Sequence, residues 1–262
     1  MIFPDYTRVI YDRNPLRQVI CQLRFPAILR ISSETPAQFQ ELIRNEYPLY
    51  EQKTEVPIIA QEIRDQFPPD ISNAMLRLDP VRAYEFSSED KKWVLSLTRD
   101  FLALTSLGYE KWENFKLHLN MPIPALTNVY KPPFFTRIGL RYQDVIRRSK
   151  LGLENIAWSE LLEPYIASEL MSPHIAPSVD EAMRIIIVNL DVGKVRIQHG
   201  LVTDTDIDTG TKEVCYLIDS DFFLEPKVEV DNVVDILDYF NAENGRLFHW
   251  CVTDRLRNAM AS

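Results

Sequence analysis

Alternating carboxylates are the most evident candidates for chemistry in this chain. Asp204, Asp206 and Asp208 are spaced by two residues ahead of a glycine, so three carboxylates could turn toward one hard cation. A calcium loop of the EF-hand type needs glycine directly after the third aspartate and a bidentate glutamate at the twelfth position. Here a threonine intervenes, and Cys215 stands at the twelfth position. We therefore expect a solvated hairpin loop and no bound metal.

A second carboxylate pair, Asp219 and Asp221, shares one face of a predicted strand because the two residues lie two apart. Such pairs serve acid–base or two-metal catalysis, but no third partner in a fixed motif accompanies them. None of the four histidines has another at metal-ligand spacing: His118, His174, His199 and His249. A Gly-x-Ser-x-Gly elbow, a Walker loop and a dinucleotide fingerprint are all missing. No catalytic residue is assigned, although a triad built from distant residues stays open.

Polar and basic side chains gather on one face of two predicted strands. They are Gln18, Gln22 and Arg24 on the first strand, and Arg137 and Arg141 on a later one. If both strands join one sheet, this face could bind an anion, a peptide or a nucleic-acid backbone, with Gly139 allowing a partner close approach. Antiparallel sheets also commonly leave one face in solvent without any ligand. These five residues are the candidate ligand-binding set, with a merely solvated face as the alternative.

The elements that would position these residues follow from the spacing of apolar side chains. Alternation predicts strands over 17–25, 134–146, 181–191, 194–203 and 213–223, a three-stranded meander over 81–107 and a further strand in 55–63. Turn residues separate the runs of each meander, so antiparallel pairing between neighbours in sequence is expected. Each half of the chain then holds one three-stranded meander.

Apolar residues at helical spacing predict five helices, over residues 36–47, 109–121, 158–170, 230–243 and 246–260. Thr35 is the expected N-cap of the first helix, with Pro36 at its first position. Pro122 and Pro124 are expected to end the second helix. Gly245 is the expected C-cap that separates the last two helices.

These elements define an α+β protein with antiparallel sheets and helices packed on one side. The charged, glycine-containing stretch 147–155 is the expected boundary between an N-terminal lobe, residues 1–150, and a C-terminal lobe, residues 151–262. The two lobes are compatible with duplication of one unit of helix-grip or TATA-binding type. They are equally compatible with an ordinary α+β chain, because no repeat period is visible.

Composition restricts the class of protein. The chain of 262 residues is 46% apolar, 26% charged and 11% aromatic, as in folded globular domains. Its net charge of −9 disfavours nucleic acid as a partner without excluding a local basic face. The three cysteines are far apart in apolar contexts, which indicates buried thiols rather than disulfides or a zinc site. With no secretory signal or membrane span in the sequence, we expect a cytoplasmic protein without a cofactor or a membrane partner.

Several longer motifs carry a family resemblance. They include Asn14-Pro15-Leu16 followed by Cys21-Gln22-Leu23-Arg24-Phe25, the strand Arg137-Ile138-Gly139-Leu140-Arg141-Tyr142, and the closing segment 248–260. In these motifs, which occur in order over nearly the whole chain, it resembles an uncharacterised, sporadically distributed bacterial family of similar length. The resemblance implies no activity, cofactor or catalytic residue. The patchy occurrence of the family is like that of mobile accessory genes, such as phage-defence or toxin–antitoxin components.

Three functions from different classes remain. A non-catalytic binding or assembly protein, acting through a protein partner or by self-association, predicts a large apolar surface patch. A nucleic-acid or nucleotide binder using Arg137 and Arg141 predicts a coherent positive patch and steep salt dependence. A metal-dependent hydrolase predicts convergent aspartates or histidines in a pocket. The sequence favours the first function over an enzyme.

Overall fold

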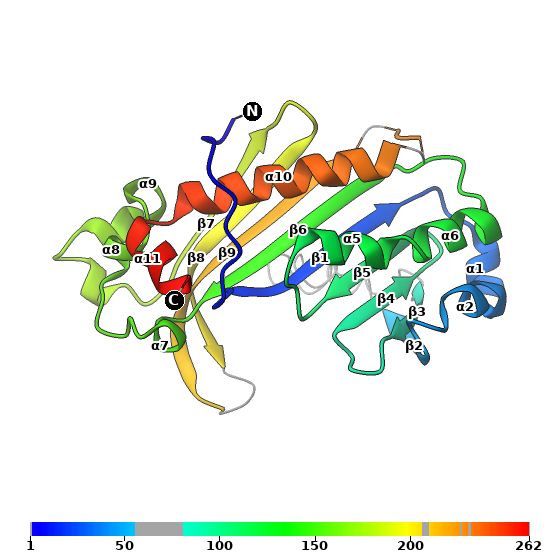
Figure 1. The fold of residues 1–262 in the computed structure, drawn as a ribbon, viewed down its shortest axis with the longest axis horizontal. Coiled ribbons are helices and arrows are strands. Elements are labelled where there is room, and N and C mark those ends of the chain that lie inside the picture. Colours follow the sequence, from blue (N-terminus) through cyan, green and yellow to red (C-terminus); the bar gives the residue numbers. More distant parts are fainter. Residues whose placement is uncertain (1, 56–80, 206–209, 226, 230–231, 262) are drawn as a thin grey trace, which may run out of the picture.

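The computed structural model describes residues 2–55, 81–205, 210–225, 227–229 and 232–261, and these form one antiparallel sheet with helices on one face (Figure 1). Nine strands follow one another across the sheet in the order β2-β3-β4-β5-β1-β6-β9-β8-β7. Their bounds are β1 Leu16–Arg24, β2 Leu49–Glu55, β3 Val81–Ser87, β4 Trp93–Leu97, β5 Phe101–Ser106, β6 Arg137–Ile146, β7 Ala182–Asn189, β8 Lys194–Thr205 and β9 Lys212–Leu224. The predicted α+β class is confirmed.

Both predicted meanders are present, as β3-β4-β5 and β7-β8-β9. Strand β1 pairs with β5 on one side and β6 on the other, and β6 pairs with β9 from Ile138 opposite Leu224 to Ile146 opposite Tyr216. The sheet therefore continues from the first half of the chain into the second. The stretch 147–155 holds the short helix α7, Arg148–Leu151. The strand predicted in 55–63 lies, beyond Glu55, outside the described residues.

Three helices cover most of one sheet face: α5, α6 and α10 (Figure 1). The helices are α1 Leu29–Ser33, α2 Ala37–Ile43, α5 Trp112–Leu119, α6 Pro122–Tyr130, α7, α8 Trp158–Leu161, α9 Pro164–Ala167, α10 Val233–Cys251 and α11 Asp254–Met260, with 3₁₀ turns η1 Ser168–Met171 and η2 Ala176–Ser178. Among the residues that the structure describes, no helix is long and apolar enough to cross a membrane.

Prolines account for three differences from the predicted helices. Pro36 itself is the N-cap of α2, so Thr35 is not. The helix expected to end at Pro122 does end before it, at Leu119, but Pro122 then begins a second helix, α6, because proline has no N–H to lose in the first turn and its φ suits a helix. Pro164 likewise begins α9, and Ser168 has a φ of 48°. The helix predicted over 158–170 is consequently three short segments.

Gly245 does not cap a helix, and α10 continues through it to Cys251. The reason for glycine is a close approach from the N-terminal segment. A Cβ atom at Gly245 would lie 1.7 Å from the Tyr6 hydroxyl oxygen, well inside van der Waals contact. The helix accepts glycine at a cost of about 1 kcal/mol relative to alanine, and in return the N-terminal segment packs directly on the helix backbone.

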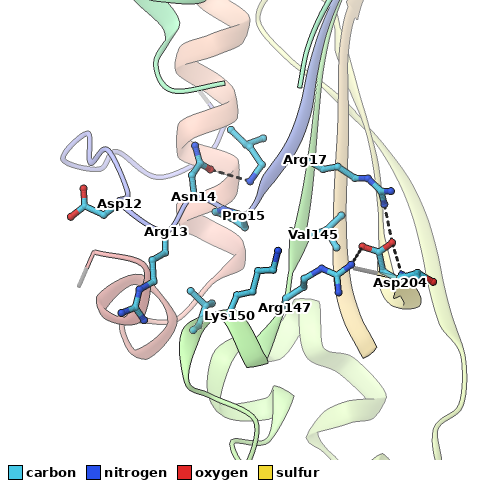
Figure 2. A pocket seen from close by; sticks show the side chains of 12 residues that line it. Asp12, Arg13, Asn14, Pro15, Arg17, Val145, Arg147, Lys150 and Asp204 are labelled. Atoms are coloured by element: carbon cyan, nitrogen blue, oxygen red, sulfur yellow. Dashed lines mark hydrogen bonds and ion pairs between the residues drawn. The ribbon is translucent and has the colours of Figure 1, made fainter. Parts of the chain in front are cut away.

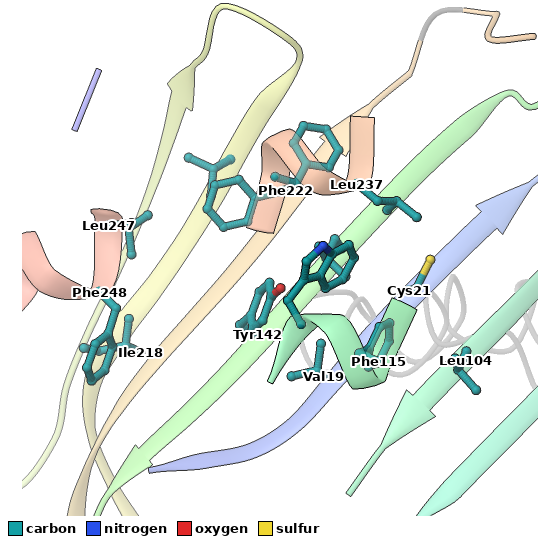
Figure 3. Close-up of a cluster of buried hydrophobic side chains, with 14 of the residues drawn as sticks. Val19, Cys21, Leu104, Phe115, Tyr142, Ile218, Phe222, Leu237, Leu247 and Phe248 are labelled. Carbon is teal, nitrogen blue, oxygen red and sulfur yellow. The ribbon is translucent and has the colours of Figure 1, made fainter. Parts of the chain in front are cut away.

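The core lies between the sheet and its covering helices. Alternate residues of the strands point into it, among them Val19, Cys21 and Leu23 of β1 and Leu140 and Tyr142 of β6 (Figure 3). Phe115 of α5 and Leu237, Leu247 and Phe248 of α10 meet them from the helix layer. All three cysteines are buried and free, as the sequence predicted. Truncation of one such leucine to alanine costs about 2–5 kcal/mol, so this layer fixes the sheet rigidly.

Candidate functional site

The five predicted ligand-binding residues lie on the sheet face opposite the helices. Gln22 stands opposite Gly139 and Arg24 opposite Arg137 in the pairing of β1 with β6, which places the two strands side by side as predicted. Gln18 donates from its amide to Gln143 at 3.2 Å. The predicted set is thus brought together on one face of one sheet.

Carboxylates from β9 pair with both arginines of this face. Arg141 donates to the two Asp219 oxygens at 2.7 and 2.5 Å, and Arg137 donates to Asp221 at 2.7 Å. The Asp219 side chain is only 5% exposed. We call these four residues the charge ladder. An incoming anion would have to displace its carboxylates, and losing a partner of a buried charge is costly.

The space above Gly139 is filled by the protein itself. A Cβ atom there would lie 2.3 Å from the Arg137 guanidinium, which folds back over the glycine and stacks on the Phe223 ring at 5.1 Å. The expected close approach of a partner at Gly139 was therefore wrong. The glycine is needed because the arginine crosses it to reach Asp221.

A basic cavity of about 690 Å³ opens at the end of the sheet near Pro15 (Figure 2). Four cationic side chains line it, Arg13, Arg17, Arg147 and Lys150, together with Asp12 and Asp204. Arg17 and Arg147 both bond Asp204, at 3.0 and 2.5 Å. The formal charge of the lining is about +2, opposite in sign to the protein as a whole. This cavity is therefore a strongly basic concavity in an acidic protein.

The described part of the chain contains no set of side chains arranged as metal ligands. No group of three or more histidine, cysteine, aspartate or glutamate side chains is arranged to hold an ion there. Asp204 is occupied by two arginines, while Asp206 and Asp208 lie outside the described residues. His199 is buried, its Nδ1 2.8 Å from the Tyr216 hydroxyl, and burial lowers its pKa. His118 stacks on Trp93 with ring centroids 3.7 Å apart. Both histidines therefore have structural surroundings.

Strand β7 is the edge of the sheet and is unusually apolar for that position. Met183, Ile185, Ile186 and Ile187 are all exposed, Ile185 to 53% and Ile187 to 61%. We call residues 183–189 the isoleucine edge. Odd-numbered residues lie on the face of the charge ladder, and Ile186 lies on the helix side, since it pairs with the buried Ile197. The edge therefore presents apolar side chains on both faces of the sheet.

Backbone groups of the isoleucine edge point away from the sheet. Leu190 N–H donates to the Gly193 carbonyl, which makes this pair a hydrogen-bonded one in the β7–β8 hairpin. Because such pairs alternate along an antiparallel ladder, Val188, Ile186 and Arg184 also bond inward to β8. The N–H and C=O groups of Met183, Ile185, Ile187 and Asn189 then face outward. They form a regular row of donors and acceptors along about 20 Å, from the rise of a strand.

The opposite edge of the sheet has different protection. Strand β2 carries Glu51 and Lys53, and Lys53 bonds Glu85 of β3 at 2.5 Å. Charged side chains at an edge resist pairing with another chain. In the isoleucine edge the one charged residue is Arg184, bonded to Glu169 of its own chain at 2.5 Å, and the pairing with β8 runs without a bulge. Among the described residues, β7 therefore carries fewer of the usual safeguards against strand addition than β2.

Comparison with protein-family models and with curated proteins gives no match for this chain. The apolar character of the isoleucine edge could have been predicted from the sequence, because the run Ile185-Ile186-Ile187 breaks the alternation expected of a half-buried strand. Its position at the edge of the sheet could not be predicted, because strand order is a property of the whole fold.

Proposed function

We propose that this protein is a non-catalytic binding and assembly protein whose isoleucine edge pairs with the same edge of a second copy. The single observation that carries this proposal is an outward row of backbone donors and acceptors flanked by exposed apolar side chains. Exposed backbone groups of that kind are a template for another strand. A protein that remained monomeric would gain solubility from charges at this edge, as β2 has.

A two-fold axis perpendicular to the sheet at Ile186 makes the edge complementary to itself. Antiparallel pairing then sets Ile185 opposite Ile187 of the second copy, and Met183 opposite Asn189. These odd-numbered residues are the ones with outward backbone groups, so each such pair exchanges two hydrogen bonds. Isoleucine packs against isoleucine on both sheet faces. No unpaired charge is buried, because Arg184 already forms an ion pair with Glu169. Isologous contacts of this kind are the commonest way in which oligomers close.

A disulfide cross-link tests the pairing directly. In this register Ile186 of one copy stands opposite Ile186 of the other as a non-hydrogen-bonded pair, whose Cα atoms lie about 4.5 Å apart and within disulfide range. Ile186→Cys should form a covalent dimer under mild oxidation in dilute solution. The three native cysteines are buried and give little background. Val234→Cys, at an exposed position on α10, is the matched control and should stay monomeric on a denaturing gel.

Light scattering on the unmodified protein completes the experiment. We expect twice the mass of the chain at micromolar concentrations. A monomer at every concentration up to the millimolar range, with no cross-link through Ile186→Cys, would overturn the proposal. A cross-link that forms only between unfolded chains would also overturn the proposal. Circular dichroism of the variant shows whether the cross-linked chains are folded.

The wider role within this proposal comes from the family resemblance. A self-assembling accessory protein fits a component of a mobile bacterial defence or toxin–antitoxin-like system, in which a neighbouring gene encodes the effector. Co-purification of the product of the adjacent gene with this protein tests that role. An Ile185→Lys variant that loses the dimer and retains the neighbour would show that the two contacts are separate.

A second candidate function, binding of a nucleotide or another phosphate compound, is supported by the basic cavity. Its positive lining in an acidic protein attracts anions locally. Pyrophosphate titration monitored by calorimetry tests it. Loss of binding in Arg13→Ala/Arg147→Ala, but not in Arg137→Ala/Arg141→Ala, would assign the anion to the cavity rather than to the charge ladder. Unchanged affinity in both double variants contradicts both sites.

A further inference from the structure

We propose that the pocket beneath the N-terminal arm binds a small organic cation, an alkylamine or a guanidinium compound, through the Asp144 carboxylate. The pocket has a volume of about 370 Å³ and lies between residues 6–16, which we call the arm, strand β6 and helix α10. A cavity of that size suits a small molecule. It lies on the helix side of the sheet and does not include the isoleucine edge, so it goes beyond the assembly function.

The arm is held over the pocket by contacts at both of its sides. Arg8 forms two hydrogen bonds with Glu113 of α5, at 2.6 and 2.8 Å. Tyr6 packs on Gly245 of α10 and its ring lies 5.3 Å from that of His249. The arm crosses α10 as a single extended segment (Figure 1). Up to Pro15 this wall of the pocket belongs to no helix or strand. Besides these side chains, backbone hydrogen bonds from Arg13 N–H to Met260 and from Val145 N–H to Pro15 hold it, and Leu16 already pairs with Asp144 in the sheet.

Asp144 is the unusual group in this pocket. Its side chain is 3% exposed and lines the cavity from β6, two residues beyond Tyr142 on the same face. No hydrogen-bond partner of its carboxyl group lies in the described part of the chain. Burial, reinforced by the negative charge of Asp219, raises the pKa of Asp144 well above its ordinary value. A buried carboxyl without a partner is costly, which is why such groups mark binding sites.

Two asparagine amides of the pocket lining have orientations fixed by hydrogen bonds. Asn241 accepts a hydrogen bond from the Tyr142 hydroxyl at 2.9 Å, and Asn244 accepts one from Ser220 at 3.2 Å. Both asparagines lie on α10 and line the pocket. With their oxygens engaged, the carboxylate of Asp144 is the acceptor left for a ligand with several N–H groups. A guanidinium or ammonium ion supplies such donors and the compensating charge.

Aromatic rings in the lining favour a cation. Tyr6, Tyr11 and Tyr109 line the pocket beside Tyr142, and ring faces attract ammonium and guanidinium groups. The cationic side chains of the lining are largely compensated. Arg8 pairs with Glu113, and Arg246 pairs with Asp5 at 3.1 Å and Glu243 at 2.8 Å. The lining alone carries a formal charge of about +1, since Arg8, Lys111 and Arg246 stand against Glu110 and Asp144, but both arginines are paired with these acids outside it.

Calorimetry with putrescine and agmatine, one diamine and one guanidinium compound, tests the proposal on the full chain. We expect saturable binding of at least one of them. Asp144→Asn should weaken it at least tenfold, because the substitution keeps the shape and removes the charge. Asp235→Asn, which removes the same charge from an exposed position in the first turn of α10, should leave affinity within twofold.

A second variant keeps Asp144 and moves the arm instead. Gly245→Ala introduces a Cβ where the Tyr6 hydroxyl lies, so it should also weaken binding while circular dichroism stays unchanged. The proposal is overturned if neither amine binds at millimolar concentration, or if Asp144→Asn binds like the unmodified protein. Binding of adenine, a neutral base, in preference to both amines would also overturn it. Dimer formation by light scattering is measured in parallel, because its loss contradicts only the assembly function.

Discussion

Replacing Ile185 and Ile187 together by lysine is the sharpest energetic test of the isoleucine edge. Full burial of one isoleucine side chain contributes about 1.5–3 kcal/mol. In the single chain Ile185 and Ile187 are 53% and 61% exposed, so pairing can add at most about half of the free energy of full burial for each side chain. Each side chain then supplies roughly 1–1.5 kcal/mol to association. A two-fold dimer contains four such side chains, which gives an upper limit of about 4–6 kcal/mol.

We expect about half of this limit in practice, because the side chains lie at a sheet edge and are not enclosed. A loss of about 3 kcal/mol raises the dimer Kd more than a hundredfold. Sedimentation velocity over a concentration series measures it. Leu117→Lys on α5, where leucine is 63% exposed, is the control for adding a lysine to a surface and should leave Kd unchanged.

The same variant should fold normally, since substitutions at exposed positions change stability by about 0.5 kcal/mol or less. A Kd that stays within threefold of the unmodified protein refutes the pairing through this edge. So does a dimer disrupted equally by Leu117→Lys. Either result would move the search for an interface to another surface of the protein.

Two further predictions concern folding stability. Asp144→Asn should raise the melting temperature at neutral pH and leave it nearly unchanged near pH 3.5. A carboxyl whose folded pKa is raised stabilises the protein below its ordinary pKa and loses that contribution as pH rises. Asparagine has no proton to lose, so its contribution does not change with pH. A melting-temperature difference between the two proteins that does not grow with pH would contradict the raised pKa of Asp144. Gly200→Ala should lower stability by at least about 2 kcal/mol, because φ is +156° and a Cβ would lie 1.7 Å from the Ala182 carbonyl oxygen of β7. Gly152→Ala is the control: with φ +69° and no neighbouring atom within 4 Å, it should lower stability by only about 1 kcal/mol. Equal urea denaturation midpoints for the two variants would show that the β7–β8 contact is not the cause of the loss in Gly200→Ala.

Periodicity predicted the strands well because it is written in consecutive residues. The alternation of Val19, Cys21 and Leu23 with polar neighbours is the burial pattern that β1 has in the sheet. Helix ends were predicted less well, since glycine and proline have more than one use. Pro122 follows the end of one helix, as expected, but also begins another that was not expected, and Gly245 serves an approach by Tyr6, which lies at the other end of the chain. No local rule contains that contact.

The candidate site shows the same division between local and distant information. The shared face of Arg137 and Arg141 was predictable, because residues on one strand need only a period of two. Their pairing with Asp221 and Asp219 was not, because it depends on β9 lying next to β6 across some eighty residues of sequence. The carboxylates had themselves been noticed as a pair. What the sequence could not supply was the strand order that makes each group the partner of the other.

Residues that attract notice in a sequence are therefore not the ones left available for binding. Charged side chains on neighbouring strands find one another, as the charge ladder does, because an unpaired charge at a half-buried position is unfavourable. Two groups available for binding lie instead where apolar patterning is strongest: the backbone of the isoleucine edge and the carboxyl of Asp144 among buried residues of β6. Both cost stability in the isolated chain, one through exposed apolar surface and the other through burial of a carboxyl. Because a second copy and an organic cation would each remove one of these costs, the two sites should respond independently, and a dimer-breaking substitution should leave amine affinity unchanged.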